Sequence, residues 1–146
     1  MILPQFYTDD IIKRAILEDI NYVDVASDYL ISEEQRNEAY FVSKADGVLC
    51  GIDVAMRVFE LLDDSFTAKV YMHDGDKVKK GDLIAEFSGK TTLLLKGERT
   101  ALNLLQHMSG IATATAKAVK LCEGTKASIA DTRKTLPSLR ALQNTR

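Results

Sequence analysis

Two adjacent cations late in the chain are the first candidates for binding chemistry. The segment 131–135 reads Asp-Thr-Arg-Lys-Thr, so Arg133 and Lys134 stand beside Thr132. Arginine offers a carboxylate or phosphate a planar fork of donors, and lysine offers it a point charge. The short apolar run 127–130 predicts a strand that would deliver this segment at its carboxyl end. A solvated turn fits the same spacing, and both interpretations stay open.

A second candidate is Arg99, at the predicted start of a helix and on the side opposite its apolar residues. The helix dipole favours acidic residues in a first turn, so an arginine there hints at a role other than helix stability. The plainer interpretation is a surface arginine paired with Glu98 or Asn103. No catalytic residue is predicted.

Other chemically suggestive residues are set aside. The segment 88–91 resembles a phosphate-binding loop, but such a loop needs glycine where Ile84 stands. His73 and His107 are isolated, and we interpret each as a surface or hydrogen-bonded histidine. The two cysteines lie among apolar neighbours and have no cysteine or histidine at ligand spacing, which predicts reduced thiols and no metal site in this chain.

The overall charge excludes some partners. The 146 residues include 19 Lys and Arg against 21 Asp and Glu, with a formal net charge of −2. No general basic field attracts nucleic acid or an anionic membrane, so anion binding must come from locally placed cations. No secretory signal is visible, and no apolar run approaches the roughly 20 residues that span a bilayer. We expect a cytoplasmic protein.

Periodicity predicts the elements that position these residues. The first part indicates a strand-rich α+β unit with a helix capped by Thr8 or Asp9, followed by a loop. The predicted later elements are a β-hairpin over 38–52, a helix over 52–62, a strand over 66–72 and a strand over 91–95.

The clearest element is a helix from Glu98 to Cys122, closed by Gly124, which tolerates a left-handed conformation. Its apolar stripe has the width of a core-facing helix face. The stripe consists of Ala101, Leu104, Leu105, Met108, Ile111, Ala112, Thr115 and Val119.

Two long motifs carry a family resemblance. The segment 97–113 reads GERTALNLLQHMSGIAT, and the segment 131–140 reads DTRKTLPSLR. Both resemble signatures of quinolinate phosphoribosyltransferases, and weaker matches run collinearly upstream, including Glu18-Asp19-Ile20 and Gly75-Asp76. The loop 21–24 departs from the family pattern, because many members have glycine before the aspartate. The resemblance covers essentially the whole chain.

The resemblance implies the conversion of quinolinate and phosphoribosyl pyrophosphate into nicotinate mononucleotide, pyrophosphate and carbon dioxide, with Mg²⁺. Arg133 and Lys134 match the family's quinolinate-binding pair, and Thr132 contributes beside them. Arg99 matches an arginine that the family donates across a homodimer interface. The acidic residues associated with Mg²⁺ belong to a part of the family that this sequence does not contain.

The implied fold is α+β, with an N-terminal α/β-sandwich (hammerhead-like) domain over 1–108. Residues 109–146 would then be the first helix and strand of an incomplete α/β barrel. We expect a premature end and no independent catalysis. A molybdenum-transport-associated phosphoribosyltransferase-like protein shares this layout. A biotinyl- or lipoyl-like carrier module, modified at Lys44, is the alternative from another class.

Overall fold

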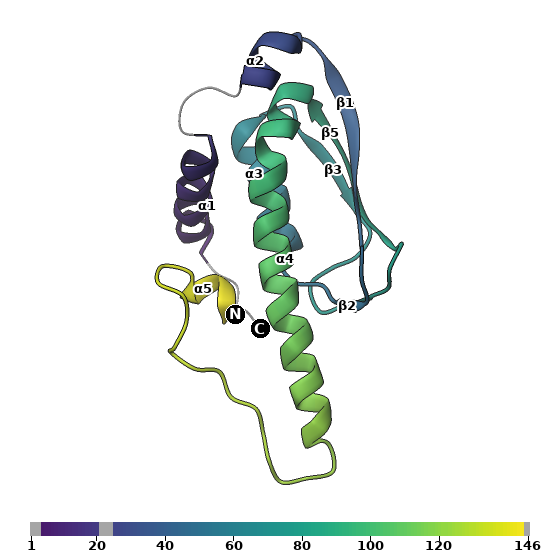
Figure 1. Ribbon diagram of the computed structural model, residues 1–146, viewed down its shortest axis with the longest axis vertical. Helices are drawn as coiled ribbons and strands as arrows, with labels where there is room; N and C mark the ends of the chain where they lie inside the picture. The colour runs from purple at the N-terminus through teal and green to yellow at the C-terminus, as the bar shows by residue number, and fades with distance from the viewer. Residues whose placement is uncertain (1–3, 21–24, 145–146) are drawn as a thin grey trace.

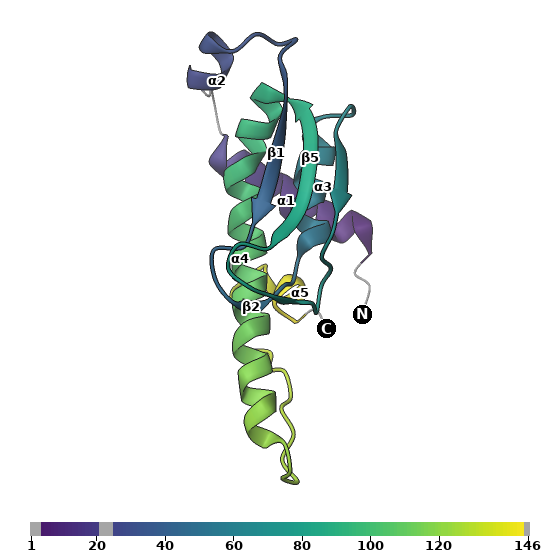
Figure 2. The same cartoon turned by 90° about the vertical axis from the view of Figure 1, so that its right-hand side faces the viewer.

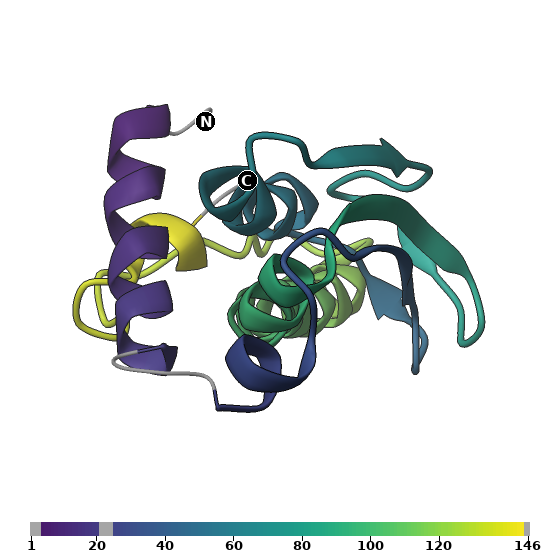
Figure 3. The ribbon, with the colours of Figure 1, turned by 90° about the horizontal axis from the view of Figure 1, so that it is seen from above.

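The computed structural model describes residues 4–20 and 25–144, which form an α+β fold in layers. Helix α1 lies on one side, two packed helices lie in the middle, and a sheet covers the other side (Figures 1 and 3). The helices are α1 (Gln5–Asp19), α2 (Val25–Leu30), α3 (Ile52–Leu62), α4 (Thr91–Cys122) and α5 (Arg140–Gln143). The strands are β1 (Arg36–Val42), β2 (Gly47–Val48), β3 (Thr67–Val70), β4 (Lys77–Val78) and β5 (Leu83–Lys90).

The sheet is antiparallel in the order β1-β5-β3, and β2 pairs separately with β4. Phe41 lies opposite Ala85, and Ala39 lies opposite Phe87, so one face of β1 and β5 is turned to the core. The predicted hairpin over 38–52 is therefore wrong, because β1 pairs with the much later β5 and not with β2. The turn residues of such a hairpin are visible locally, but pairing across more than forty residues is decided by the packing of the core.

Four phenylalanines fill the space between the sheet and α3. The ring centroid of Phe87 on β5 lies 4.9 Å from that of Phe41 and 5.0 Å from that of Phe59. The ring of Phe66 stacks on Phe59 at 5.4 Å and lies 5.9 Å from Phe87. Such offset and tilted contacts add to the stabilisation from burying the rings. This cluster joins β1, β3, β5 and α3 into one core.

Glycines allow the chain to approach α4 closely. A Cβ at Gly97 would lie 2.8 Å from the Phe59 ring, and one at Gly51 would lie 2.6 Å from the Met108 sulfur. Gly51 also has a φ of 95°, which L-amino acids with side chains rarely adopt. Next to Gly51, two hydroxyls of α4 accept hydrogen bonds from the backbone. The Ser109 hydroxyl accepts from the Cys50 N–H at 3.0 Å, and the Thr113 hydroxyl accepts from the Val48 N–H at 2.9 Å. Two helix side chains thus hold the segment around β2 against α4.

Several predicted boundaries change. The predicted strand over 91–95 is wrong: these residues form the first turn of α4, directly after β5. A run of three leucines fits either structure, and burial at Leu94, Gly97 and Ala101 follows the helical period. The predicted loop after residue 18 contains α2, and the sequence-divergent loop 21–24 lies outside the described residues. The predicted helix 52–62 is confirmed, and the strand predicted over 66–72 is shorter, as β3.

Helix α4 is buried along only part of its length. The predicted apolar stripe is covered as far as Met108, whereas Ile111 and Ala112 are half-buried and Val119 is 47% exposed. In Figure 2 the second half of α4 extends beyond the sheet, accompanied only by the segment that returns towards α5. Gly124 has a φ of 78°, which confirms its predicted role at the helix end. No helix within 4–20 and 25–144 is both long and apolar enough to cross a bilayer.

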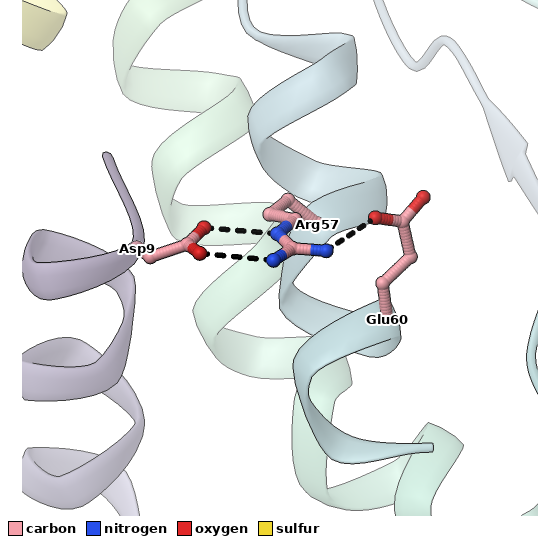
Figure 4. Close-up of polar contacts among 3 residues, drawn as sticks. All are labelled: Asp9, Arg57 and Glu60. Carbon is pink, nitrogen blue, oxygen red and sulfur yellow. Dashed lines mark hydrogen bonds and ion pairs between the residues drawn. The ribbon is translucent and has the colours of Figure 1, made fainter. Parts of the chain in front are cut away.

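An arginine fork fastens α1 to α3. Nε and Nη2 of Arg57 each donate to one oxygen of Asp9 at 2.9 Å, and Nη1 donates to Glu60 at 3.0 Å (Figure 4). The hydrogen bonds from Arg57 hold the pKa of Asp9 below its usual range, against the opposing effect of burial. Thr8 and Asp9 were predicted as helix caps, but α1 begins at Gln5, so both lie inside it.

A buried carboxylate joins the end of α3 to the start of α4. Asp63 is 6% exposed and accepts the Ser65 hydroxyl at 2.6 Å and the Lys90 N–H at 2.8 Å. Burial raises the pKa of Asp63, but the hydrogen bonds from Ser65 and Lys90 and the charge of Arg36 outweigh it, and the net pKa is lowered. Gly89 leaves room for this carboxylate, since a Cβ there would lie 2.8 Å from its oxygen.

We predict that Arg57→Lys lowers the free energy of unfolding by about 1 kcal/mol, because lysine cannot form the two parallel bonds to Asp9. Urea titration followed by circular dichroism measures this. Arg14→Lys is the matched control, since the Arg14–Asp10 pair is mostly exposed and should contribute less. Equal losses for the two variants would contradict the assignment of Arg57 as the fastening between the helices.

We predict that Asp63→Asn removes an acid-dependent part of the stability. A carboxyl whose pKa is lowered on folding stabilises the fold above its unfolded-state pKa, about 3.9, and this contribution is lost as the pH falls through the folded-state pKa. The natural chain should therefore lose more stability than Asp63→Asn between pH about 7 and about 3. Asp64→Asn, at the exposed neighbouring position, should behave like the natural chain. Parallel losses in all three proteins would refute the prediction.

Candidate functional site

The segment with the two cations is held by α5. Nη2 of Arg140 donates to the Arg133 carbonyl at 3.4 Å, and the side-chain amide of Asn144 donates to the Thr132 carbonyl at 3.3 Å. Within the segment, the Lys134 N–H donates to the Thr132 hydroxyl at 3.2 Å. These bonds shape the backbone of the segment without using the charged ends of Arg133 and Lys134.

The predicted strand over 127–130 is wrong. These residues have no assigned strand and are exposed, so the cations follow a connection without regular secondary structure and not a strand end. A strand needs a neighbouring strand to pair with, and the sheet β1-β5-β3 lies against another part of α4. Helix α5, just after the cations, holds the segment in place of a sheet.

Arg133 and Lys134 are exposed, and neither forms an ion pair with any residue of 4–20 or 25–144. In contrast, Arg57 and Arg99 are both matched to aspartates. Two adjacent cations with no carboxylate partner in the described chain can bind an anion without first breaking an internal salt bridge.

Arg99 lies elsewhere on α4. It sits on the exposed side, as predicted, and its Nη1 donates to Asp19 at the end of α1, at 2.8 Å. The expected partners Glu98 and Asn103 are not the ones it contacts. The argument from the helix dipole is also wrong, because α4 begins eight residues before Arg99, beyond the first turn where the dipole acts.

The two predicted site regions are separate within one chain. Arg99 contacts α1, whereas the segment 132–134 contacts α5, and α5 meets α4 at His107. Eight residues of helix, about 12 Å along the axis, separate Arg99 from His107. The contacts of the described chain therefore do not join Arg99 to Arg133 and Lys134 in one site.

Two surface hollows of the described chain are lined by residues other than these cations. One lies over the outer face of the sheet and is lined by residues such as Tyr40 and Glu86. The other lies between α2 and the start of α4, where Lys96 forms an ion pair with Asp28. Thr132, Arg133 and Lys134 line neither of these two hollows, and all three residues are exposed.

Metal ligands do not gather within the described part of the chain. Among residues 4–20 and 25–144, no group of three histidines, cysteines or carboxylates is close enough together to hold a metal ion. The residues present therefore do not fit a Mg²⁺ site.

His107 received no functional role from the sequence. It was interpreted as a surface or hydrogen-bonded histidine. Its Nε2 lies 2.8 Å from the side-chain nitrogen of Gln143 on α5. Gln143 also accepts the Leu136 N–H at 2.9 Å. Periodicity offered no signal for this contact, because α5 is four residues long and carries little pattern.

Comparison with known proteins places the chain among a set of related sequences. Residues 24–109 match the model for the quinolinate phosphoribosyl transferase N-terminal domain. Residues 111–145 match the model for the C-terminal domain of the same family. The two matches meet inside α4, which runs through both without a break.

Individual relatives agree with these matches. The chain is 41% identical over 133 residues to a probable nicotinate-nucleotide pyrophosphorylase (carboxylating) of Bacillus subtilis, covering 91% of this chain and 46% of that protein. It is 41% identical over 140 residues to a nicotinate-nucleotide pyrophosphorylase (carboxylating) of Mycobacterium leprae, covering 92% of this chain and 48% of that protein. The chain spans about half the length of the relatives it matches.

Solved structures share the fold. NadC from Streptococcus pyogenes superposes with a TM-score of 0.93 at 38% identity, over 97% of this chain and 50% of that one. The nicotinate-nucleotide pyrophosphorylase from Francisella tularensis gives a TM-score of 0.90 at 32% identity, over 97% of this chain and 50% of that one.

We predict that Arg99→Ala changes the free energy of unfolding by less than about 1 kcal/mol, because exposed ion pairs contribute little. The Arg99 side chain is 71% exposed. Gly97→Ala, two residues earlier on the buried face, is the comparison. Its added methyl group meets Phe59 and should cost about 1–3 kcal/mol. Urea titrations of both variants measure the difference, and a loss for Arg99→Ala as large as that for Gly97→Ala would show that Arg99 serves the fold.

Proposed function

Because this chain belongs to the quinolinate phosphoribosyl transferase family, we propose that it supplies part of an enzyme of NAD biosynthesis. The proposed reaction transfers the phosphoribosyl group from phosphoribosyl pyrophosphate to quinolinate with decarboxylation. Its products are nicotinate mononucleotide, pyrophosphate and carbon dioxide. In this proposal residues 1–108 form the N-terminal domain and residues 109–146 begin the barrel domain.

The observation that carries the proposal is the exposed pair Arg133 and Lys134, with no carboxylate partner in the described chain. Quinolinate carries two carboxylates on a pyridine ring, so a protein of net charge −2 can bind it only through cations gathered at one place. Arg133 suits a bidentate grip on one carboxylate, and Lys134 adds a point charge. The Thr132 hydroxyl accepts the Lys134 N–H and fixes the turn beside them.

These residues act by holding and neutralising the substrate. With its charge balanced, the pyridine nitrogen attacks the ribose carbon, a carbon–nitrogen bond forms, and the bond to pyrophosphate breaks. The carbon–carbon bond to the 2-carboxylate then breaks, carbon dioxide leaves with its own oxygens, and the ring carbon takes a proton. We assign no proton transfer to a residue of this chain.

Arg99 serves a different subunit in this proposal. We propose a homodimer in which Arg99 reaches the partner's site, since within its own chain it contacts α1 and lies away from the segment 132–134. Within the described chain, Asp19 engages one guanidinium nitrogen of Arg99, and the Arg99 side chain is 71% exposed. Asp19 thus restrains Arg99 while leaving donors for a carboxylate.

We assign no residue within 4–20 or 25–144 to the Mg²⁺ that the family resemblance implies. The described residues lack a suitable ligand cluster, so no step is routed through the ion. We propose a cytoplasmic enzyme whose partners are quinolinate and phosphoribosyl pyrophosphate, with no role in nucleic-acid or membrane binding. The carrier alternative loses its structural basis, because Lys44 does not sit in the tip of a β1–β2 hairpin.

The 146-residue chain alone should not turn over substrate, because Arg133 and Lys134 are exposed to water. The test therefore joins residues 1–143 to the second half of the B. subtilis relative and measures nicotinate mononucleotide from quinolinate. We predict an active chimera, and a loss of at least about 100-fold in kcat/KM for Arg133→Ala, as expected for removing a charged contact to substrate. No product from a folded chimera would reject the proposal, and would favour the molybdenum-transport-associated type.

Mixing two inactive variants of the chimera tests whether Arg99 acts in the site of the partner subunit. Chimeras carrying Arg99→Ala or Arg133→Ala should each be inactive as homodimers. After mixing and subunit exchange, a heterodimer holds one site with both arginines, so about a quarter of the activity should return. A mixture that stays inactive, with exchange verified by native mass spectrometry, would show that both arginines act within one chain.

A further inference from the structure

The contact between α4 and α5 has a defined hydrogen-bond direction. The side-chain oxygen of Gln143 accepts the Leu136 N–H at 2.9 Å, which fixes the orientation of the amide. The amide nitrogen, which can only donate, is therefore the atom that lies 2.8 Å from Nε2 of His107. In this arrangement Nε2 is the acceptor, which requires an imidazole ring with its proton on Nδ1. His107, Gln143 and Leu136 form one chain of hydrogen bonds, here called the relay.

The relay holds the segment that carries the two cations. Leu136 follows shortly after that segment. Arg140, the first residue of α5, and Asn144, directly after its last residue, donate to the carbonyls of Arg133 and Thr132. Helix α5 is too short to be stable alone, so it depends on its contacts with α4 and the core. Leu142, which is 2% exposed, supplies the apolar contact, and the relay supplies the polar one.

We propose that His107 and Gln143 are positioning residues for the segment 132–134, and that protonation of His107 releases this segment. The description of the segment as a substrate clamp rests on the proposed function; the relay itself does not. An imidazolium presents a donor at Nε2, opposite the Gln143 donor. If the amide turns over, its oxygen accepts from the imidazolium, but Leu136 then faces the amide nitrogen. In either arrangement the Leu136 N–H or the His107 contact is lost.

No neighbouring carboxylate among the described residues holds His107 in place of its contact with Gln143. No carboxylate within the described residues forms an ion pair with His107. Asp9 and Asp19 of α1 are engaged by Arg57 and Arg99. The other charged side chains on α5 and the segment beside it are Asp131, Arg133, Lys134 and Arg140.

Nuclear magnetic resonance of the 146-residue chain tests the relay without substrate. Histidines change charge between about pH 5 and 8, so spectra at these two limits compare the two states. We predict that Nε2 of His107 is unprotonated at the upper limit. The hydrogen-exchange protection factor of the Leu136 amide, corrected for intrinsic exchange, should be about tenfold lower at the lower pH. A tenfold change is the size expected for the loss of one hydrogen bond. A protonated Nε2 at the upper limit, or unchanged Leu136 protection, would overturn the proposal.

Three variants distinguish the relay from general acid destabilisation. His107→Leu removes the acceptor, so Leu136 should be weakly protected at both limits. Gln143→Glu offers an oxygen to both partners, so acid should now strengthen the contact with the imidazolium and the pH dependence should reverse. His73→Gln, at an exposed histidine with no side-chain bond in the described chain, should behave like the natural chain. A Gln143→Glu chain that still loses Leu136 protection in acid would refute the relay.

These measurements are independent of catalysis. If the chimera makes no nicotinate mononucleotide but Leu136 protection responds to pH as predicted, the proposed function fails and the relay stands. If the chimera is active but Leu136 protection does not respond to pH, the relay fails and the proposed function stands.

Discussion

The contact between Gly97 and the ring of Phe59 sets how closely α3 and α4 approach each other. A methyl group at residue 97 would lie 2.8 Å from that ring, closer than non-bonded carbon atoms pack. Phe59 in turn stacks on Phe66 and Phe87, so the position of α3 determines the position of the sheet. The glycine therefore governs a core to which α3, α4, β1, β3 and β5 all contribute.

Helix α4 links this core to the candidate binding residues. Its first half is buried against α3 and the sheet, and Arg99 projects from the opposite side of that half. Further along, His107 meets α5, which holds the segment 132–134. Because one unbroken helix carries both contacts, the rotation of α4 about its axis fixes Arg99 and the docking point of α5 together. Residues distant in sequence are thus oriented by one packing interface.

Four cationic residues of this acidic chain differ in how their charges are used. Arg57 is used structurally, since its fork joins α1 to α3 and is largely withdrawn from solvent. Arg133 and Lys134 are exposed and are held through their backbone, so their charges remain unmatched within the described chain. Arg99 is intermediate, with one bond to Asp19 and a mostly exposed guanidinium. This division separates the residues proposed for substrate binding from those that stabilise the fold.

The sequence by itself determined the α+β class, the helix over 52–62, the family and the identity of the candidate residues. These depend on local periodicity and on contiguous motifs, which need no knowledge of distant contacts. Only the tertiary structure decided that β1 pairs with β5, that residues 91–95 begin α4, and that Asp9 binds Arg57 and does not cap α1. It also replaced the predicted strand over 127–130 with a connection held by α5. Strand pairing and the docking of a four-residue helix depend on long-range packing, which leaves no local period in the residues themselves.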